Sequence, residues 1–292
     1  MKRIAIPLLL SLSLLLSGCQ NTDTGSNGGD SASTGAESAL FSDWDLDGSY
    51  DESAAVHIQL EGETAVCDSD AVSIDGSRIT LLDEGTYLVS GALTDGQIVV
   101  DAGDTDKVQI VLAGASLTCA DSAAIYSKSA DKVFLTLAEG TENTLTNGGS
   151  YIAIDENNID SVVFSKTDLT LNGSGSLTID AQAGHGVVSK DELTITGGSY
   201  TVTAAEHGMT GKDSLAVAGG DFTIISGKDG LHAENADDSA LGFLYVADGT
   251  FTITAQGDAV SASGALQVDG GTFDLTTGGG SASVTMTTGD SF

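Results

Sequence analysis

Oxygen-bearing side chains gather in one short stretch of the chain, and their types favour calcium. Asp229, Glu234 and Asn235 are followed by Asp237, and Asp258 comes in the next repeat of the sequence. Calcium takes about six to eight oxygen ligands from carboxylates, amides and carbonyls, whereas magnesium prefers a strict octahedron that includes several waters. The residue types therefore predict a calcium site formed by these five side chains.

A solvated acidic edge is the alternative to a metal site. The chain carries 42 Asp and Glu residues, so clusters arise by chance. In that interpretation Lys212 pairs with Glu234 across neighbouring repeats. A second acidic run at 155–160 has a similar composition and is a further candidate for calcium.

Histidines recur at one position of the repeat. His185-Gly186 and His207-Gly208 start 22 residues apart, and Asp229-Gly230 follows after the same interval. Stacked repeats place equivalent residues in one column, so these histidines either fill a turn or serve catalysis or metal binding. Filling the column is the simpler interpretation. His57 and His232 are isolated in the sequence.

Three side chains favour contact with a carbohydrate. Tyr245 takes the middle, outward position of an apolar-x-apolar triplet. An outward aromatic ring on a flat sheet can stack on the apolar C–H face of a sugar; a Tyr partly covered by the inserted loop is the alternative. Lys212 and Lys228 lie close in sequence to the acidic cluster, where they could contact an acidic sugar.

The charge of the chain makes nucleic acid a poor partner. Its 10 Lys and Arg against 42 Asp and Glu give a formal net charge of −32, and a nucleic-acid binder needs a basic face to displace counterions. Hydrophobic residues make up 40% of the chain, which argues against wholesale disorder. The 38 glycines and single proline favour tight turns between short strands.

The first residues have the pattern of a bacterial lipoprotein signal. Lys2 and Arg3 precede an apolar stretch, and Leu16-Ser17-Gly18-Cys19 resembles a lipobox with cleavage before Cys19. We expect a signal peptide at 1–18, lipidation of Cys19 with a polar tether at 19–40, and a folded domain at 41–292. No obvious cap follows the last repeat, which leaves open that the domain continues. A secretory signal with an incidental Cys is the alternative.

Two further cysteines, Cys67 and Cys119, lie on separate strand-like segments. A secreted protein could pair them, but two separate small core residues is the simpler interpretation. No Cys/His spacing typical of a zinc site occurs in the sequence.

An internal repeat indicates the fold. Each unit has an apolar-x-apolar triplet, a Gly-rich turn dipeptide, and a second triplet opened by an aromatic residue. The aromatic positions are Tyr200, Phe222, Phe251 and Phe273. Such alternation indicates strands with one buried face, and strands this short bury a core only when coils stack about 4.8 Å apart. We therefore predict an interior ladder of aromatic rings.

The repeat predicts an all-β, single-stranded parallel β-helix, a solenoid of roughly ten coils over 56–285. A β-propeller is the alternative fold, but its blades need about 40–50 residues and four longer strands. The period-two alternation excludes a helical solenoid.

Four motifs between 166 and 283 resemble a known family. They are SKTDLTLNGSGSLTI, GHGVVSKDELTITGGSYTVTAAEHGMTGKDSLAVAGGDFTI, GKDGLHAEN and GGTFDLTTGGGS, and they are similar to the carbohydrate-binding-domain-containing lipoproteins of clostridia and related bacteria. The resemblance implies a right-handed parallel β-helix like that of pectate lyases, with bound calcium and affinity for plant polysaccharides that include acidic sugars.

The resemblance is incomplete in two places. Asp229, Glu234 and Asn235 fall inside GKDGLHAEN, which implies calcium near them without assigning individual ligands. The fourth unit, however, reads Asp258-Ala259-Val260 where a Gly often follows the Asp. The polar C-terminal extension that is common in the family is also missing.

Three functions fit these observations. The first is a non-catalytic, lipid-anchored protein on the outer face of the bacterial membrane that binds plant cell-wall glycans, such as polyuronate or cellulose, with calcium bridging to acidic sugars. The second is a pectate-lyase-type enzyme that uses calcium and a Lys base. The third is a structural surface adhesin whose acidity keeps it soluble. We expect the first.

Overall fold

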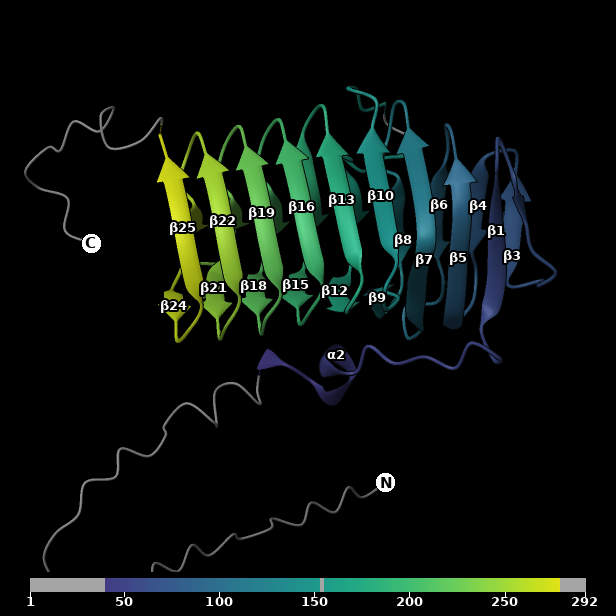
Figure 1. The fold of residues 1–292 in the computed structure, drawn as a ribbon, viewed down its shortest axis with the longest axis horizontal. Coiled ribbons are helices and arrows are strands. Elements are labelled where there is room, and N and C mark those ends of the chain that lie inside the picture. Colours follow the sequence, from purple (N-terminus) through teal and green to yellow (C-terminus); the bar gives the residue numbers. More distant parts are fainter. Residues whose placement is uncertain (1–39, 153–154, 279–292) are drawn as a thin grey trace, which may run out of the picture.

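The computed structural model describes residues 40–152 and 155–278, and it shows a solenoid whose strands stack along one long axis (Figure 1). Strands of successive coils pair in parallel. Among the described strands, antiparallel pairing is confined to the first coil, where β1 (Val56–Gly62) pairs with β2 (Ala65–Val66) and β3 (Val72–Asp75) with β4 (Arg78–Leu81). The prediction of a parallel β-helix is confirmed.

Each coil contributes strands to three faces of the solenoid. The strap face, named for the segment that covers it, contains β9 (Lys132–Leu137), β12 (Asp168–Gly173), β15 (Glu192–Ile195), β18 (Ser214–Val217), β21 (Phe243–Val246) and β24 (Leu266–Val268). The ladder face contains β10 (Glu142–Asn147), β13 (Ser176–Ala181), β16 (Ser199–Ala204), β19 (Asp221–Ser226), β22 (Thr250–Ala255) and β25 (Thr272–Thr277).

The histidine face completes the solenoid. Besides β3 and β4 it contains β6 (Gln97–Asp101), β8 (Ile125–Ser129), β11 (Ser161–Ser165), β14 (His185–Ser189), β17 (Met209–Gly211), β20 (Leu231–Ala233) and β23 (Val260–Ala262). The long strands β5 (Gly85–Leu93) and β7 (Lys107–Cys119) run from the strap face onto the ladder face, because β7 pairs with β9 at one end and with β10 at the other.

The predicted aromatic ladder is present inside the ladder face. Tyr200, Phe222, Phe251 and Phe273 occupy equivalent positions of adjacent strands. Their rings stack with centroids 5.3, 4.8 and 4.7 Å apart in that order. Spacing of this size follows from the separation of paired strands. The register predicted from the repeat is therefore confirmed for these coils.

Close packing of coils explains the glycine of the His-Gly and Asp-Gly dipeptides. A Cβ added at Gly186 would lie 2.5 Å from the carbonyl oxygen of Gly208, and one at Gly208 would lie 2.6 Å from that of Gly230. The backbone of the next coil thus leaves no room for a side chain. This steric demand, rather than any chemistry of binding, accounts for the recurring glycine.

An N-terminal strap, residues 40–55, lies against the outer surface of the strap face and runs along the solenoid (Figure 1). It contains the short helix α2 (Asp43–Leu46), whose N-terminus is capped by the side chain of Ser42. Phe41 packs on the outer surface of β18 and β21, and Tyr50 packs against the cluster of Leu88, Val111 and Ala138 at the other end of the face. The strap therefore spans most of the strap face.

Both cysteines in the described part of the chain are free, and Cys119 is buried, which agrees with the simpler interpretation of two separate core residues. Within residues 40–152 and 155–278, no helix has the length and apolar character needed to span a membrane. The predicted signal peptide and lipidated Cys19 lie outside the described residues.

Candidate functional site

The predicted histidine column forms a series of turn hydrogen bonds. The amide of His207 donates to Nδ1 of His185 at 3.2 Å, and the amide of Asp229 donates to Nδ1 of His207 at 3.1 Å. One coil further, the amide of Asp258 donates to Oδ1 of Asp229 at 2.8 Å. Burial lowers the pKa of His185 and of His207 to about 4, so both imidazoles are neutral acceptors at pH 7. The histidines thus fill the column with hydrogen bonds from one coil to the next, as expected.

His232 joins this column although it has no partner in the sequence. Its ring stacks on that of His207 with centroids 4.0 Å apart, and His207 in turn stacks on His185 at 5.1 Å. His232 is the outward residue of β20 and pairs with Thr210 of the preceding coil. The signal in the sequence was an outward histidine, His232, three residues after Asp229 of the histidine column, and it was missed.

The five predicted calcium ligands do not converge on one point. Asp229 precedes the short strand β20, whereas Glu234 and Asn235 follow it, and a strand advances about 3.3 Å per residue. Asn235 is buried and caps a turn: its Oδ1 accepts the amide of Asp237, and its Nδ2 donates to Oδ1 of Asp213. Glu234 instead approaches Nε2 of His232 at 3.3 Å.

Two lysines predicted to face a carbohydrate are held by carboxylates. Nζ of Lys212 lies 2.9 Å from Oδ2 of Asp237, so Lys212 pairs with Asp237 and not with Glu234, the partner given in the alternative interpretation. Nζ of Lys228 lies 3.1 Å from Oε2 of Glu206. The hydrogen bond that Lys212 donates to Asp237 raises the pKa of Lys212, which keeps the ammonium group protonated.

An acidic column runs beside these residues. Asp191 and Asp213 stand one coil apart, since the amide of Asp213 donates to the carbonyl oxygen of Asp191, and Asn235 follows in the next coil. Burial, the charge of Asp168 and the carboxyl of Asp213 together raise the pKa of Asp191 to about 6. Two carboxyl groups held this close favour either a shared proton or a bound cation.

Asp191→Asn should raise the stability of the cation-free protein at neutral pH. The pKa of Asp191 rises from 3.8 unfolded to about 6 folded, so its contribution to stability is present below pH 3.8 and is lost as the pH rises through 6. The amide of Asn keeps a donor for Asp213 and carries no charge. Urea unfolding in EDTA should show the gain at pH 7.5 and none at pH 4; an equal effect at both pH values would contradict it.

Tyr245 points outward as predicted but does not present a free ring. Only 2% of the residue is exposed, because Phe41 of the strap packs on it with ring centroids 6.1 Å apart. Its hydroxyl donates to Oδ2 of Asp269 at 2.9 Å. The expectation of an exposed stacking surface at Tyr245 is therefore wrong: the cover is the strap, which starts some 200 residues earlier in the chain.

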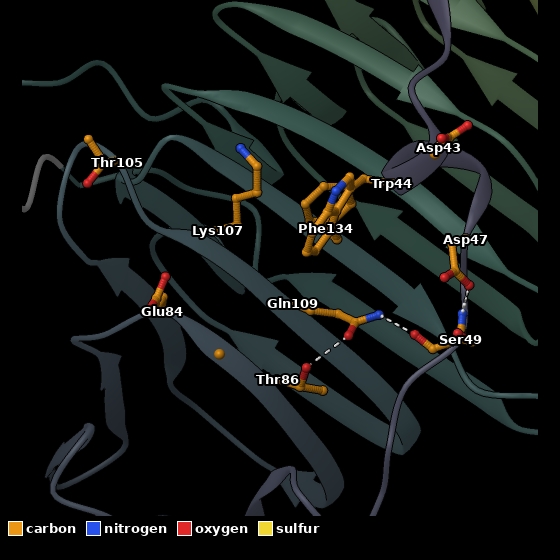
Figure 2. A pocket seen from close by; sticks show the side chains of 11 residues that line it. Asp43, Trp44, Asp47, Ser49, Glu84, Thr86, Thr105, Lys107, Gln109 and Phe134 are labelled. Carbon is orange, nitrogen blue, oxygen red and sulfur yellow. Dashed lines mark hydrogen bonds between the residues drawn. The ribbon is translucent and has the colours of Figure 1, made fainter.

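A groove of about 740 Å³ lies further along the strap face (Figure 2). Its floor is one row of outward side chains on three adjacent strands: Thr86 of β5, Gln109 of β7 and Phe134 of β9. The strap forms the opposite wall of the groove. The strap residues that line the groove are Asp43, Trp44, Asp47 and Ser49.

Trp44 and Phe134 give the groove an aromatic platform. Their ring centroids are 6.1 Å apart, and 63% of Trp44 remains exposed. Beside them, Gln109 accepts from the hydroxyl of Thr86 at 3.0 Å and donates to the carbonyl of Ser49 at 3.2 Å (Figure 2). Sequence reasoning left Trp44 unassigned, although an outward Phe134 in the middle of a triplet was a visible signal.

Charged side chains surround the platform. Lys107 lines the groove and is paired with Asp131, and the carboxylates of Asp43, Asp47 and Glu84 also line it. An apolar ring plane beside amide, hydroxyl and carboxylate groups is the chemistry that binds a sugar, whose C–H face packs on the ring while its hydroxyls form hydrogen bonds.

Comparisons with known proteins agree with this chemistry. A family model described as "Carbohydrate-binding domain-containing protein" matches residues 75–292. A relative of the same description from Acetivibrio thermocellus is 38% identical over 137 residues, which cover 46% of this chain and 48% of that protein. The chain thus matches about half the length of that relative.

A solved structure shares the fold. It is that of a polysaccharide lyase-like protein from C. thermocellum, as a gadolinium derivative. The two chains superpose with a TM-score of 0.68 at 33% identity, over 77% of this chain and 95% of the other.

Proposed function

Because this chain belongs to the carbohydrate-binding domain-containing family, we propose that it is a non-catalytic polysaccharide-binding protein of the bacterial cell surface and that the groove at Trp44 is a glycan site. The observation that carries the proposal is the exposed indole of Trp44 above Phe134. The family match begins at residue 75 and so covers the strand floor of the groove, while Trp44 lies ahead of it.

The charge of the groove favours a neutral glycan. Asp43, Asp47 and Glu84 line it, and its cation, Lys107, is already paired with Asp131. A carboxylate-bearing sugar would meet like charge there. A β-linked neutral chain such as cellulose, which offers flat C–H faces, is therefore the class of ligand we assign to this groove.

Binding of acidic glycans is proposed to depend on calcium, which supplies the positive charge that the protein lacks. The five ligands expected from the sequence do not fit, since they do not converge. The carboxylates of Asp191 and Asp213 fit better, because burial and the neighbouring carboxyls of Asp168 and Asp213 raise the pKa of Asp191, and a bound cation would offset that cost.

Attachment to the outer face of the cell membrane through Cys19 is part of the proposal. The lipobox at 16–19 supports it. The described domain is acidic, so anionic lipid should repel it and leave the lipid as the membrane contact.

A lyase is the runner-up because the solved relative is called polysaccharide lyase-like. β-Elimination needs a neutral base beside the calcium to remove a proton. The pKa of Lys212 is raised by Asp237, which opposes its use as a base. Incubation with polygalacturonate and calcium should therefore yield no unsaturated product; formation of that product would favour the lyase.

Trp44→Ala should weaken the binding of a cello-oligosaccharide by about fivefold or more, since an aromatic stacking contact contributes about 1 kcal/mol beyond its buried area. Isothermal titration measures the affinity. Leu46→Ala is the matched control, because Leu46 is on the same helix, is 58% exposed and does not line the groove. Equal binding by the wild type and by Trp44→Ala would place the glycan elsewhere.

A further inference from the structure

The histidine face carries three potential metal ligands that carbohydrate binding does not use. One ligand atom each of His207, Asp229 and His232 lies within 4.8 Å of the other two. In the part of the chain that the structure describes, no other group of three His, Cys, Asp or Glu side chains meets this criterion. We infer that His207, Asp229 and His232 bind a divalent transition-metal ion of the zinc type.

The ligand atoms lie near the spacing of tetrahedral coordination, with Oδ2 of Asp229 and Nδ1 of His232 closer together than a bound ion would hold them. Zinc lies about 2.0–2.2 Å from nitrogen and oxygen ligands, which places neighbouring ligand atoms about 3.3 Å apart. Oδ2 of Asp229 lies 2.8 Å from Nδ1 of His232 and 3.4 Å from Nδ1 of His207. The two imidazoles stack nearly parallel, at 13°, so one ring must turn out of the stack for both to direct a nitrogen to the same ion.

The donor set identifies the class of ion. Calcium and magnesium prefer oxygen ligands, whereas imidazole nitrogen suits zinc, copper, nickel and iron. Two imidazoles and one carboxylate therefore form a site for these metals rather than for calcium. The same Asp229 that the sequence assigned to calcium is placed by the fold between two nitrogen donors.

Neighbouring groups hold the ligands in place. Oδ1 of Asp229 accepts the amide of Asp258, which leaves Oδ2 facing the imidazoles. Nε2 of His232 lies 3.3 Å from Oε2 of Glu234, and a carboxylate on the far nitrogen is the usual support of a metal-bound histidine. Nδ1 of His232 is enclosed and makes no hydrogen bond in the structure, despite its closeness to Asp229. An ion between these atoms would satisfy it.

His207 brings its lone pair to the site in a fixed position. Its Nδ1 accepts the amide of Asp229, so the proton of the neutral ring is on Nε2 and the lone pair is on Nδ1. A bound metal must displace the amide of Asp229 from this lone pair. Substitution of Asp229 or His232 therefore tests the metal site more selectively than substitution of His207, because it leaves this hydrogen bond in place.

Metal binding would tie two coils of the solenoid together. His207 precedes β17, whereas Asp229 and His232 belong to the next coil around β20. The side chains of His207, Asp229 and His232 are only 14%, 15% and 12% exposed. An ion held there is shielded from solvent on most sides and stabilises the folded chain alone, which raises the midpoint of thermal unfolding.

Titration of the tag-free, EDTA-treated full chain with Co²⁺ and with Zn²⁺ tests the site. We expect one saturable site, with cobalt absorption in the visible region typical of a low coordination number and a higher unfolding midpoint with zinc. Asp229→Asn, which keeps an oxygen for the amide of Asp258, and His232→Gln should each lower the affinity by at least about tenfold. His57→Gln, an exposed histidine in β1, is the matched control and should bind as the wild type does.

A wild type that binds no metal, or variants that bind it unchanged, would overturn the inference. If the variants fold poorly, ¹⁵N NMR of the wild-type imidazoles decides: zinc should shift the nitrogens of His207 and His232 and leave those of His57, and equal shifts in all three would count against the site. Asp191→Asn should abolish the calcium response and keep the zinc response. Failure of the calcium proposal is thereby separated from failure of this one.

Discussion

Phe222→Ala should lower the free energy of unfolding by about 3–5 kcal/mol, the range for emptying a buried aromatic position. Phe222 is 2% exposed and stacks between Tyr200 and Phe251, at 5.3 and 4.8 Å. Loss of the ring leaves a cavity and also removes a contact from each neighbouring ring. Because coils contact only their neighbours, this damage cannot be spread over the whole core.

Equilibrium unfolding in urea, followed by circular dichroism, measures this loss. Ile225→Ala is the matched control on the same strand, because Ile225 faces outward and is 54% exposed. Its effect should stay within about 0.5 kcal/mol. If Phe222→Ala were as mild as Ile225→Ala, the stacked rings would not be an important part of the core.

The ladder and the histidine column could be predicted from the sequence because both are periodic. In a solenoid, residues one repeat apart become neighbours, so Tyr200 and Phe222, or His185 and His207, are paired by counting alone. The same counting explains why His232 was missed. It occupies a different position of the repeat from His207, and only the fold of the intervening turn brings the two rings together.

The groove and the cover on Tyr245 could not be predicted in this way, because the strap is not part of the repeat. Asp45 reaches Thr170, 125 residues further along the chain, and Phe41 reaches Tyr245. Such contacts follow no period. The predicted calcium ligands failed for a third reason: residue types showed the right chemistry, but Asn235 turns inward to cap a turn.

Asp45→Ala should release the strap from an otherwise folded solenoid. Asp45 is 2% exposed and its Oδ1 lies 2.7 Å from Nζ of Lys132. It also accepts from Ser42 at 2.6 Å and from Thr170 at 2.5 Å. Burial alone would raise the pKa of Asp45, but the partners Lys132, Ser42 and Thr170 lower it below 3.8. Breaking a buried ion pair from one side costs about 3–5 kcal/mol.

That loss should be local, because the strap can separate while the coils keep their strand pairing. Hydrogen exchange should show loss of protection in residues 40–55 alone, with Tyr245 newly open to solvent and glycan binding at Trp44 lost. Asp43→Ala, an exposed acid of the same helix, should leave the strap protected. The contribution of Asp45 is present above pH 3.8 and is lost as the pH falls through its lowered pKa, so acid should release the strap of the wild type as well. Unchanged protection of the strap in Asp45→Ala would mean that Phe41 and Tyr50 hold it without the ion pair, and the groove would then not depend on Asp45.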